Sequence, residues 1–287
     1  MTIKKDQRIG LILKKAQNSN TRDRVLALIR SRLNSKKRFS VLSANPEILL
    51  LALKDNSLAS ILLSSDVLIN DGVGLSIAND FLSEKTYKNK LLAFFIYIFQ
   101  GLVQGFGALF LKDKKVLKGR DLFMDIVKLG NRLNWKIFLL GGRKDEALKT
   151  KEKLNVSFKK IEIEQDQGPI LNSFGQPISK KEEEKQIEAI EKINSFKPDI
   201  VFVGFGAPKQ EYWISNNAKK IDSKGIVAVG GTYNYIAGNI RLPLSFFEKA
   251  GLEWFWRLIT EPKRIIRIIN AVIVFPIRIF LYKFSQD

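Results

Sequence analysis

Short apolar segments alternate along this chain with longer segments whose apolar residues recur every three or four positions. The short segments predict strands, with their closing turns, within residues 38–46, 66–70, 135–142, 159–164, 198–206 and 225–231. The longer segments predict helices within residues 46–60, 119–134, 182–196 and 207–221. Because strands alternate with helices, we expect an α/β fold: a Rossmann-like, mostly parallel sheet with helices on both faces.

The turns that follow the predicted strands are the expected location of a ligand site. In open parallel sheets, ligands bind beyond the carboxyl ends of the strands. The turns in question lie at residues 43–47, 71–74, 141–143, 204–211 and 230–234.

Residues 91–111 form a 21-residue segment without charge, with lysines on both sides. Its length would allow it to cross a membrane. A crossing would place the turn at Asp71 and the later strands of the same sheet on opposite sides of that membrane. Glycines at 101, 105 and 107 would allow a bend into a hairpin. We expect insertion without crossing; a buried core or oligomer helix and a true span are the alternatives.

The last segment, from about residue 251, is also apolar but carries regularly spaced arginines. Its longest uncharged run, 268–277, is too short to cross a membrane. On a helix, Arg264, Arg267 and Arg278 fall within about 60° of one another. A basic stripe on an apolar helix predicts an interfacial membrane helix, and a packed helix with solvated arginines is the alternative.

Charge adds a second constraint. The chain of 287 residues has 48 Lys and Arg against 29 Asp and Glu, a net charge of +19, which indicates a polyanionic partner.

The chain is expected to have three parts. They are a basic N-terminal segment (1–40), an α/β catalytic domain (41–240) with the apolar insertion 91–111, and a C-terminal helical appendage (241–287) that binds the membrane and the acceptor. The apolar run from Ile9 to Leu13 is too short for a signal peptide, so we expect a cytoplasmic protein.

The sequence contains neither Cys nor His. It therefore offers no disulfide, no thiolate nucleophile, no His-based triad and no His-ligated metal site. Acid–base chemistry falls to Asp, Glu, Lys or Tyr. Asp71, which follows a strand and precedes Gly-Val-Gly, is a candidate base, with a simple Asp turn as the alternative. Ser43 and Asn45 could bind sugar hydroxyls or phosphate, although Asn45 before Pro46 is also typical of a helix N-cap.

Three glycine-rich turns could hold a phosphorylated donor. Backbone N–H groups at Gly141 and Gly142, before a helix, could hold a diphosphate, or they could simply form the helix entry. The turn after the next strand offers Gly204 and Gly206 for close approach, together with Lys209 for phosphate, Gln210 for a base or sugar amide, and Glu211. The last turn offers a similar arrangement at Gly230, Gly231 and Thr232.

These residues belong to motifs that follow one another in a fixed order. The motifs are Ser43-Ala44-Asn45-Pro46-Glu47, Asp71-Gly72-Val73-Gly74, Lys118-Gly119-Arg120-Asp121-Leu122, Gly204-Phe205-Gly206-Ala207-Pro208-Lys209-Gln210-Glu211, Gly230-Gly231-Thr232-Tyr233-Asn234, Arg241-Leu242-Pro243, Gly251-Leu252-Glu253-Trp254 and Glu261-Pro262-Lys263-Arg264. In this order, over about residues 40–267, they resemble the WecG/TagA/CpsF glycosyltransferase family.

The resemblance implies an inverting, metal-independent transfer without a cofactor. The donor would be a UDP-sugar, typically UDP-N-acetylmannosamine or its uronic acid, and the acceptor a polyprenyl-diphosphate-linked N-acetylglucosamine for surface polysaccharide. It implies that Asp71 is the base and that Arg257, Arg264 and Arg267 hold the lipid diphosphate. It also implies a peripheral or monotopic protein on the cytoplasmic face of the membrane, with homo-oligomers in solution. Asn234, where the family usually has Asp, and the long segment 91–111 depart from its pattern.

Two other readings remain open at this point. A basic nucleic-acid- or polyanion-binding protein without activity would explain the net charge, although no nucleic-acid motif of the usual kinds occurs and the uncharged 21-residue segment would be unexplained. A dinucleotide-dependent oxidoreductase would need a G-x-G-x-x-G turn after the first strand, and the sequence lacks one there.

Overall fold

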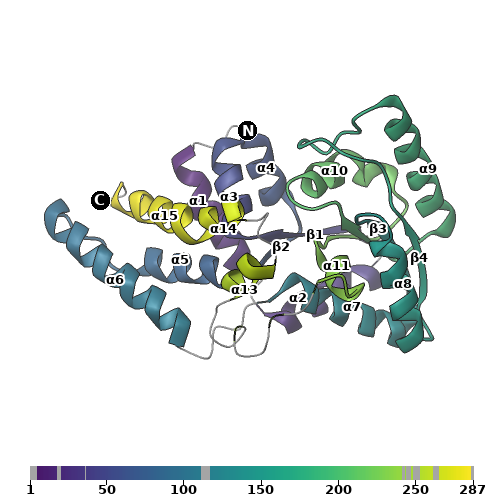
Figure 1. Cartoon of the computed structure of the whole chain (residues 1–287), viewed down its shortest axis with the longest axis horizontal. Coiled ribbons are helices and arrows are strands. Elements are labelled where there is room, and N and C mark those ends of the chain that lie inside the picture. The colour runs from purple at the N-terminus through teal and green to yellow at the C-terminus, as the bar shows by residue number, and fades with distance from the viewer. Residues whose placement is uncertain are drawn as a thin grey trace.

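The centre of the molecule is a parallel β-sheet. The structure is a computed structural model, and it describes residues 5–17, 21–35, 37–110, 117–240, 243, 247, 253–260 and 265–285. Within these residues, six strands pair in parallel in the order β2-β1-β6-β5-β3-β4 (Figure 1). The strands are β1 (Phe39–Ala44), β2 (Val67–Asn70), β3 (Lys136–Gly141), β4 (Glu162–Asp166), β5 (Ile200–Gly204) and β6 (Gly225–Ala228). The predicted α/β class and its strands are confirmed.

Helices cover both faces of this sheet and bury a hydrophobic core on each. Alternate strand residues point to opposite faces, so Phe138 and Leu140 of β3 join one core while Ile137 and Leu139 join the other. The first core is covered by α3 (Pro46–Lys54), α4 (Asn56–Ser64), α9 (Lys180–Phe196) and α10 (Lys209–Asn217). The second is covered by α7 (Gly119–Leu133), α8 (Glu146–Ser157) and α11 (Thr232–Ile236).

The single helix predicted at 46–60 is divided in two. Asp55 ends α3 and caps α4, because its Oδ1 accepts from the backbone N–H groups of Ser57 and Leu58 at 2.9 and 3.2 Å. Asp is a favoured N-cap residue, and its extended backbone interrupts the helical path. The apolar spacing therefore located the helical region correctly but not the break.

Two helices that the sequence analysis did not predict lie in the basic N-terminal segment. They are α1 (Lys5–Gln17) and α2 (Arg22–Asn34). Ile12 and Leu13 of α1 are buried in the first core, and Val25 and Ile29 of α2 in the second. The segment thus contributes to both cores.

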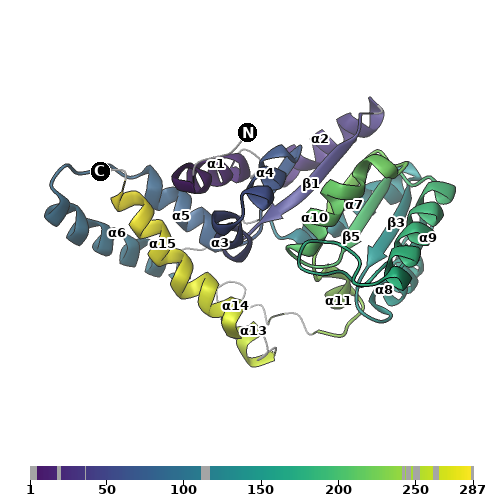
Figure 2. The same cartoon turned by 90° about the horizontal axis from the view of Figure 1, so that it is seen from above.

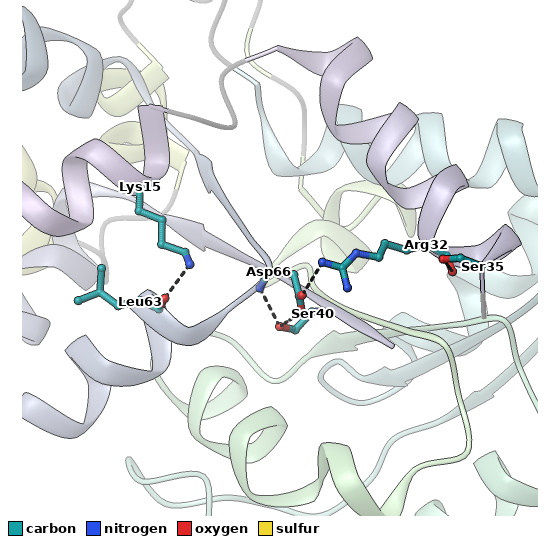
Figure 3. Close-up of polar contacts among 6 residues, drawn as sticks. All are labelled: Lys15, Arg32, Ser35, Ser40, Leu63 and Asp66. Atoms are coloured by element: carbon teal, nitrogen blue, oxygen red, sulfur yellow. Dashed lines mark hydrogen bonds and ion pairs between the residues drawn. The ribbon is translucent and has the colours of Figure 1, made fainter. Parts of the chain in front are cut away.

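A polar cluster fixes these helices to the amino ends of β1 and β2 (Figure 3). Asp66 Oδ2 accepts from the backbone N–H of Ser40 at 2.9 Å, and its Oδ1 lies 3.2 Å from Arg32 of α2. Lys15 of α1 donates to the carbonyl of Leu63 at 2.6 Å, and burial lowers the pKa of this lysine. The contacts lie at the end of the sheet opposite to the predicted site.

A helical extension projects beyond β2 (Figures 1 and 2). It contains α5 (Val73–Ser83), α6 (Lys90–Phe110), α14 (Ile265–Ile269), a π-helical turn (Asn270–Val274) and α15 (Phe275–Phe284). The helix α6 continues through Gly101 and Gly105, so the bend that these glycines would allow is not formed there. A helix tolerates isolated glycines at a modest cost.

The C-terminal helix is anchored to α5 and α6 by a buried lysine. Lys283 is only 2% exposed; its Nζ donates to the carbonyl of Phe81 at 2.5 Å and lies 4.6 Å from the ring centroids of Phe81 and Tyr97. The stretch from Ile265 to Phe284 forms 20 helical residues, which by length and composition alone would suffice to cross a membrane. The helical stretch is longer than the uncharged run 268–277, because it also contains charged residues such as Arg267 and Arg278. That it lies in the membrane interface remains a prediction.

Candidate active site

Asp71 lies at the carboxyl edge of the sheet, immediately after β2. Its backbone N–H donates to the carbonyl of Ala44, at the end of β1, at 2.8 Å. Its Oδ1 accepts from the backbone N–H of Gly119, the first residue of α7, at 3.1 Å. Because the N-terminus of a helix carries partial positive charge, this contact helps to hold the side chain of Asp71 in place. The arrangement presents a half-buried carboxylate in a fixed position, which is what a general base requires.

Gly72 and Gly74, which follow Asp71, are needed for different structural reasons. Gly72 has a φ of +136°, yet a Cβ built there would meet no atom within 4 Å, so only the backbone conformation requires glycine. At Gly74 a Cβ would lie 2.9 Å from Pro46 Cγ. Gly74 therefore allows the turns after β1 and β2 to touch, which brings Asn45 and Asp71 into one region.

Ser43 and Asn45 flank the end of β1. The Oδ1 of Asn45 accepts from the backbone N–H of Ile48 at 2.9 Å and caps α3, which is the structural alternative considered for this residue. Ser43 is half-buried within β1, opposite Ile69. Their predicted contacts with substrate remain predictions.

Gln210 connects the turns after β5 and β6. Its Oε1 accepts from the backbone N–H groups of Gly206 at 3.3 Å and Gly230 at 3.0 Å, and its Nε2 donates to Glu211 Oε1 at 2.9 Å. Both ends of this buried amide thus have partners within the protein. The geometry gives Gln210 a positioning role for these two turns.

Glu211 lies beneath the turns rather than at their surface. It is fully buried, and burial raises the pKa of its carboxyl group to about 7. Among the residues that the structure describes, its Oε2 has no hydrogen-bond partner. A carboxyl group in this environment holds its proton up to near-neutral pH.

Two other predicted donor-binding side chains bond to the backbone. Lys209 donates to the carbonyl of Leu171 at 2.6 Å, and Thr232 donates to the carbonyl of Val229 at 2.6 Å. Gly231, in contrast, is exposed, and Gly206 (φ +81°) would have no atom within 4 Å of an added Cβ. The backbone of these glycines can be approached closely.

The glycines at the ends of β3 and β5 are packed tightly. A Cβ on Gly204 would lie 2.5 Å from the ring of Tyr233, and one on Gly141 would lie 3.0 Å from the backbone of Gly204. The N–H of Gly142 donates to the carbonyl of Gly204 at 3.1 Å. Close packing alone therefore accounts for these three glycines, and their role in donor binding remains a prediction.

Of the three arginines expected to bind diphosphate, only Arg267 has a described side chain. Arg264 lies outside the described residues, and Arg257 belongs to α13 (Glu253–Thr260). The Nε of Arg267 lies 3.2 Å from Glu47 Oε1. This ion pair places the C-terminal helix against the turn after β1.

Sequence reasoning missed several contacts at this edge. The N–H of Gly119 and the carboxylate of Glu47 belong to motifs that it singled out, but their partners are distant in the chain. The guanidinium of Arg120 lies 5.7 Å from the ring centroid of Tyr235 in α11, which links α7 to the turn after β6. Within the described part of the chain, no three acidic side chains gather where they could hold a metal ion.

A separate groove of about 770 Å³ lies between α2 and α7, away from the turns at the carboxyl edge. Cationic side chains line much of it: Arg22, Arg30, Lys128 and Arg132. Among the described residues that line it, Asp125 is the only acidic one, and it is buried and paired with Arg22. The groove contains none of the residues predicted for catalysis or substrate binding.

Comparison with known proteins gives a consistent result along the whole chain. The model of the glycosyl transferase WecG/TagA/CpsF family matches residues 12–96 and 100–287. The chain is similar to proteins named N-acetylglucosaminyldiphosphoundecaprenol N-acetyl-beta-D-mannosaminyltransferase. In Bacillus subtilis (strain 168) the identity is 26% over 253 residues, covering 88% of this chain and 84% of the relative. In Bacillus spizizenii it is 25% over 238 residues, covering 83% and 77%. In Staphylococcus aureus (strain MRSA252) it is 28% over 170 residues, covering 59% and 60%.

Proposed function

Because this chain belongs to the WecG/TagA/CpsF glycosyl transferase family, we propose that it transfers N-acetylmannosamine, or its uronic acid, from a UDP-sugar to N-acetylglucosamine on a polyprenyl diphosphate. The names of its relatives support the acceptor and the sugar. The observation that carries the proposal is the carboxylate of Asp71, held on the N-terminus of α7 beside the turn after β1. Glycosyl transfer is the enzyme class; the donor and the details of the reaction are proposed.

In the proposed reaction Asp71 is the general base. Its carboxylate takes the proton from the acceptor hydroxyl as that oxygen attacks the anomeric carbon of the donor. The new glycosidic bond forms while the bond from the anomeric carbon to the UDP oxygen breaks on the opposite side, which inverts the configuration. UDP leaves with the electron pair, and the proton remains on Asp71 until water removes it.

Two groups of residues would hold the phosphates without a metal ion. The turns that Gln210 connects, with Gly206, Gly230 and Gly231, would receive the UDP moiety, because their backbone can be approached closely. Arg257, Arg264 and Arg267 would hold the acceptor diphosphate, since guanidinium groups bind phosphate through paired hydrogen bonds.

The lipid acceptor places this reaction at a membrane, and we propose the cytoplasmic face. The apolar stretch from Ile265 to Phe284 fits a membrane-associating appendage, and Arg267 within it lies 3.2 Å from Glu47, next to the turn after β1. Basic residues near an anionic leaflet would each add about 1 kcal/mol of attraction.

The decisive experiment is UDP release by the purified protein. A panel of UDP-sugars would be tested with and without a short-chain lipid-diphosphate-N-acetylglucosamine, and with and without EDTA. We expect release only when one N-acetylmannosamine-type donor and the acceptor are both present, and no effect of EDTA. Failure to bind any UDP-sugar would overturn the proposal, and salt-sensitive binding of DNA would then support the polyanion-binding alternative. Loss of release in EDTA, restored by Mg²⁺, would overturn only the metal-free mechanism.

A further inference from the structure

The helix α6 buries only a narrow stripe of its surface. Ala93 and Tyr97, four residues apart, are fully buried. The ring of Tyr97 packs on Phe81 of α5, with centroids 5.9 Å apart, and on Phe280 of α15, with centroids 6.5 Å apart. This stripe fixes α6 to the rest of the protein, and the opposite side of the helix faces away from the cores.

The outer side of α6 is a large apolar surface. Eight large apolar side chains on it are between 40 and 72% exposed: Leu91, Leu92, Phe94, Phe95, Ile98, Phe99, Leu102 and Val103. At 100° per residue they cover an arc of about 180°. A soluble monomer rarely exposes so many neighbouring apolar side chains, so this surface indicates a partner.

The apolar surface continues onto the C-terminal helix. Phe94 and Phe280 meet edge to face with ring centroids 5.8 Å apart, where α6 crosses α15 (Figure 2). Exposed apolar side chains then follow on α14, the π-helical turn and α15: Ile265, Ile266, Ile269, Val272, Ile273, Ile277 and Leu281. Two segments that are far apart in the sequence therefore form one apolar surface.

The charged residues that flank α6 indicate what kind of partner binds its apolar surface. Exposed Lys85, Lys88 and Lys90 precede the uncharged part of the helix, and the sequence Lys-Asp-Lys-Lys follows at 112–115. An anionic lipid leaflet has the matching order of an apolar interior and negatively charged headgroups. A second copy of this chain would present the same lysines and repel them. A packed helix pair also usually buries a narrower stripe than half of the circumference.

We propose that α6 lies in one leaflet of an anionic membrane as a second anchor beside the C-terminal helix. Its apolar arc contacts the acyl chains, and the exposed Lys85, Lys88 and Lys90 before it remain among the headgroups. Lys283 and Phe280 hold α15 against α6, so that both helices enter the membrane as one unit. Membrane binding through α6 does not require the donor, the acceptor sugar or Asp71. It rests on the proposed function only in that the function specifies which membrane the protein binds.

The first test is flotation with vesicles of phosphatidylcholine and phosphatidylglycerol. The double variant Phe95→Glu/Phe99→Glu places charge on the arc, and Val156→Glu/Ile187→Glu is the matched control, because these two side chains are exposed on α8 and α9. The two substitutions remove apolar area that would contact acyl chains and add carboxylates that an anionic leaflet repels. We therefore expect at least about tenfold weaker vesicle binding for the α6 variant and no change for the control.

A second test reports insertion directly and does not rely on a destabilising charge. Since the chain has no Cys, a polarity-sensitive fluorophore can be attached at Phe99→Cys, with Ile187→Cys as control. We expect a blue shift, and quenching by brominated acyl chains, only at position 99. Turnover of a short-chain acceptor in solution should be unchanged in the α6 double variant, which separates this proposal from the catalytic one.

Two results would overturn the proposal. One is vesicle binding and fluorophore quenching that are the same at α6 as at the control positions. The other is a wild-type oligomer that the α6 double variant converts to a monomer while vesicle binding persists, which would make this surface an interface between copies of the chain.

Discussion

The carboxyl edge of the sheet has two parts that differ in how their glycines are used. At the ends of β3 and β5 the glycines are packed, and a Cβ on Gly204 would meet the ring of Tyr233 at 2.5 Å. Next to Asp71 the edge is open at Gly72, where a Cβ would meet nothing within 4 Å, while Gly74 packs on Pro46. The two parts are similar in sequence, since each has a glycine at the end of a strand or two residues after it, and they differ in the space around that glycine.

This difference separates glycines that build the fold from glycines that leave room for a ligand. The boundary falls within one turn, because Gly204 is packed while Gly206, two residues later, is open. Gln210 holds that open turn to the one after β6. This arrangement supports the proposal that the donor binds over Gly206 and Gly230 and that the reacting hydroxyl lies near Asp71.

The largest predicted change in the free energy of unfolding is at Gly204, in the packed part of the edge. Gly204→Ala should lower the free energy of unfolding by about 3 kcal/mol, because the rigid ring of Tyr233 has to move within the core. Gly206→Ala should cost only the strain of its positive φ, about 1–2 kcal/mol. Urea unfolding of both variants measures the contrast, and equal losses would remove the distinction between the two glycines.

The next effect concerns the buried acid beneath the open turns. The pKa of Glu211 is about 7 in the folded protein, above its ordinary value of 4.5, so the stability that its protonated form gives is lost as pH rises from about 4.5 through 7. Glu211→Gln cannot ionise but still accepts from Gln210. The variant should match the wild type at pH 4.5 and exceed it by roughly 3 kcal/mol well above pH 7. A pH-independent difference in urea unfolding would contradict this account.

A smaller effect is expected where α7 supports Asp71. Gly119 is the first residue of α7, a position where proline fits a helix, so Gly119→Pro removes the N–H that Asp71 accepts and keeps the helix. Losing one hydrogen bond to a charged group should reduce kcat about tenfold. Gly119→Ala keeps the N–H, and its Cβ would lie at an ordinary 3.8 Å from Asp71 Oδ2. Equal turnover of the two variants would show that this contact does not support Asp71.

The smallest effect is expected at the ion pair of Glu47 and Arg267. Both side chains are partly exposed, at 27 and 52%, and such pairs contribute about 0–1 kcal/mol. A double-mutant cycle with Glu47→Gln and Arg267→Gln should give a coupling free energy below about 1 kcal/mol that decreases with salt. A much larger, salt-independent coupling would mean that the pair is a structural anchor of the appendage.

Five of the strands were predictable because each is a short apolar run closed by a turn, whereas β4 (Glu162–Asp166) contains a single apolar residue. The parallel order then places Asp71, Asn45 and Gly206 at one edge. The helix α1 could also have been predicted, because Ile9, Ile12, Leu13 and Ala16 recur at helical spacing. The basic segment was described by its charge alone, so this spacing was not used. The break at Asp55 could not be derived from apolar spacing, which is the same on both sides of it.

Side-chain partners at the site were the least predictable part. Lys209 and Thr232 have the chemistry to bind phosphate, yet both bond to carbonyl groups of the chain. The partner of Lys209 is Leu171, which only the folded structure brings near, and the partner of Thr232 is Val229, three residues before it. Whether Gly204 and Gly206 are packed or open depends on Tyr233, which lies about thirty residues further along the chain. The sequence motifs therefore identify the turns of the candidate site. Which atoms of these turns can contact a ligand depends on side-chain packing in the fold.

The most direct test of the central claim compares catalysis and donor binding in Asp71→Asn. The amide keeps the shape of the side chain and can still accept from Gly119, but it cannot take a proton. We expect kcat to fall by about 10²–10⁴-fold while the Kd for the UDP-sugar, measured by calorimetry, stays within about twofold of the wild type. Asp222→Asn, at an exposed carboxylate away from this edge, is the control. Turnover of Asp71→Asn near the wild-type level would contradict the assignment of Asp71 as the base.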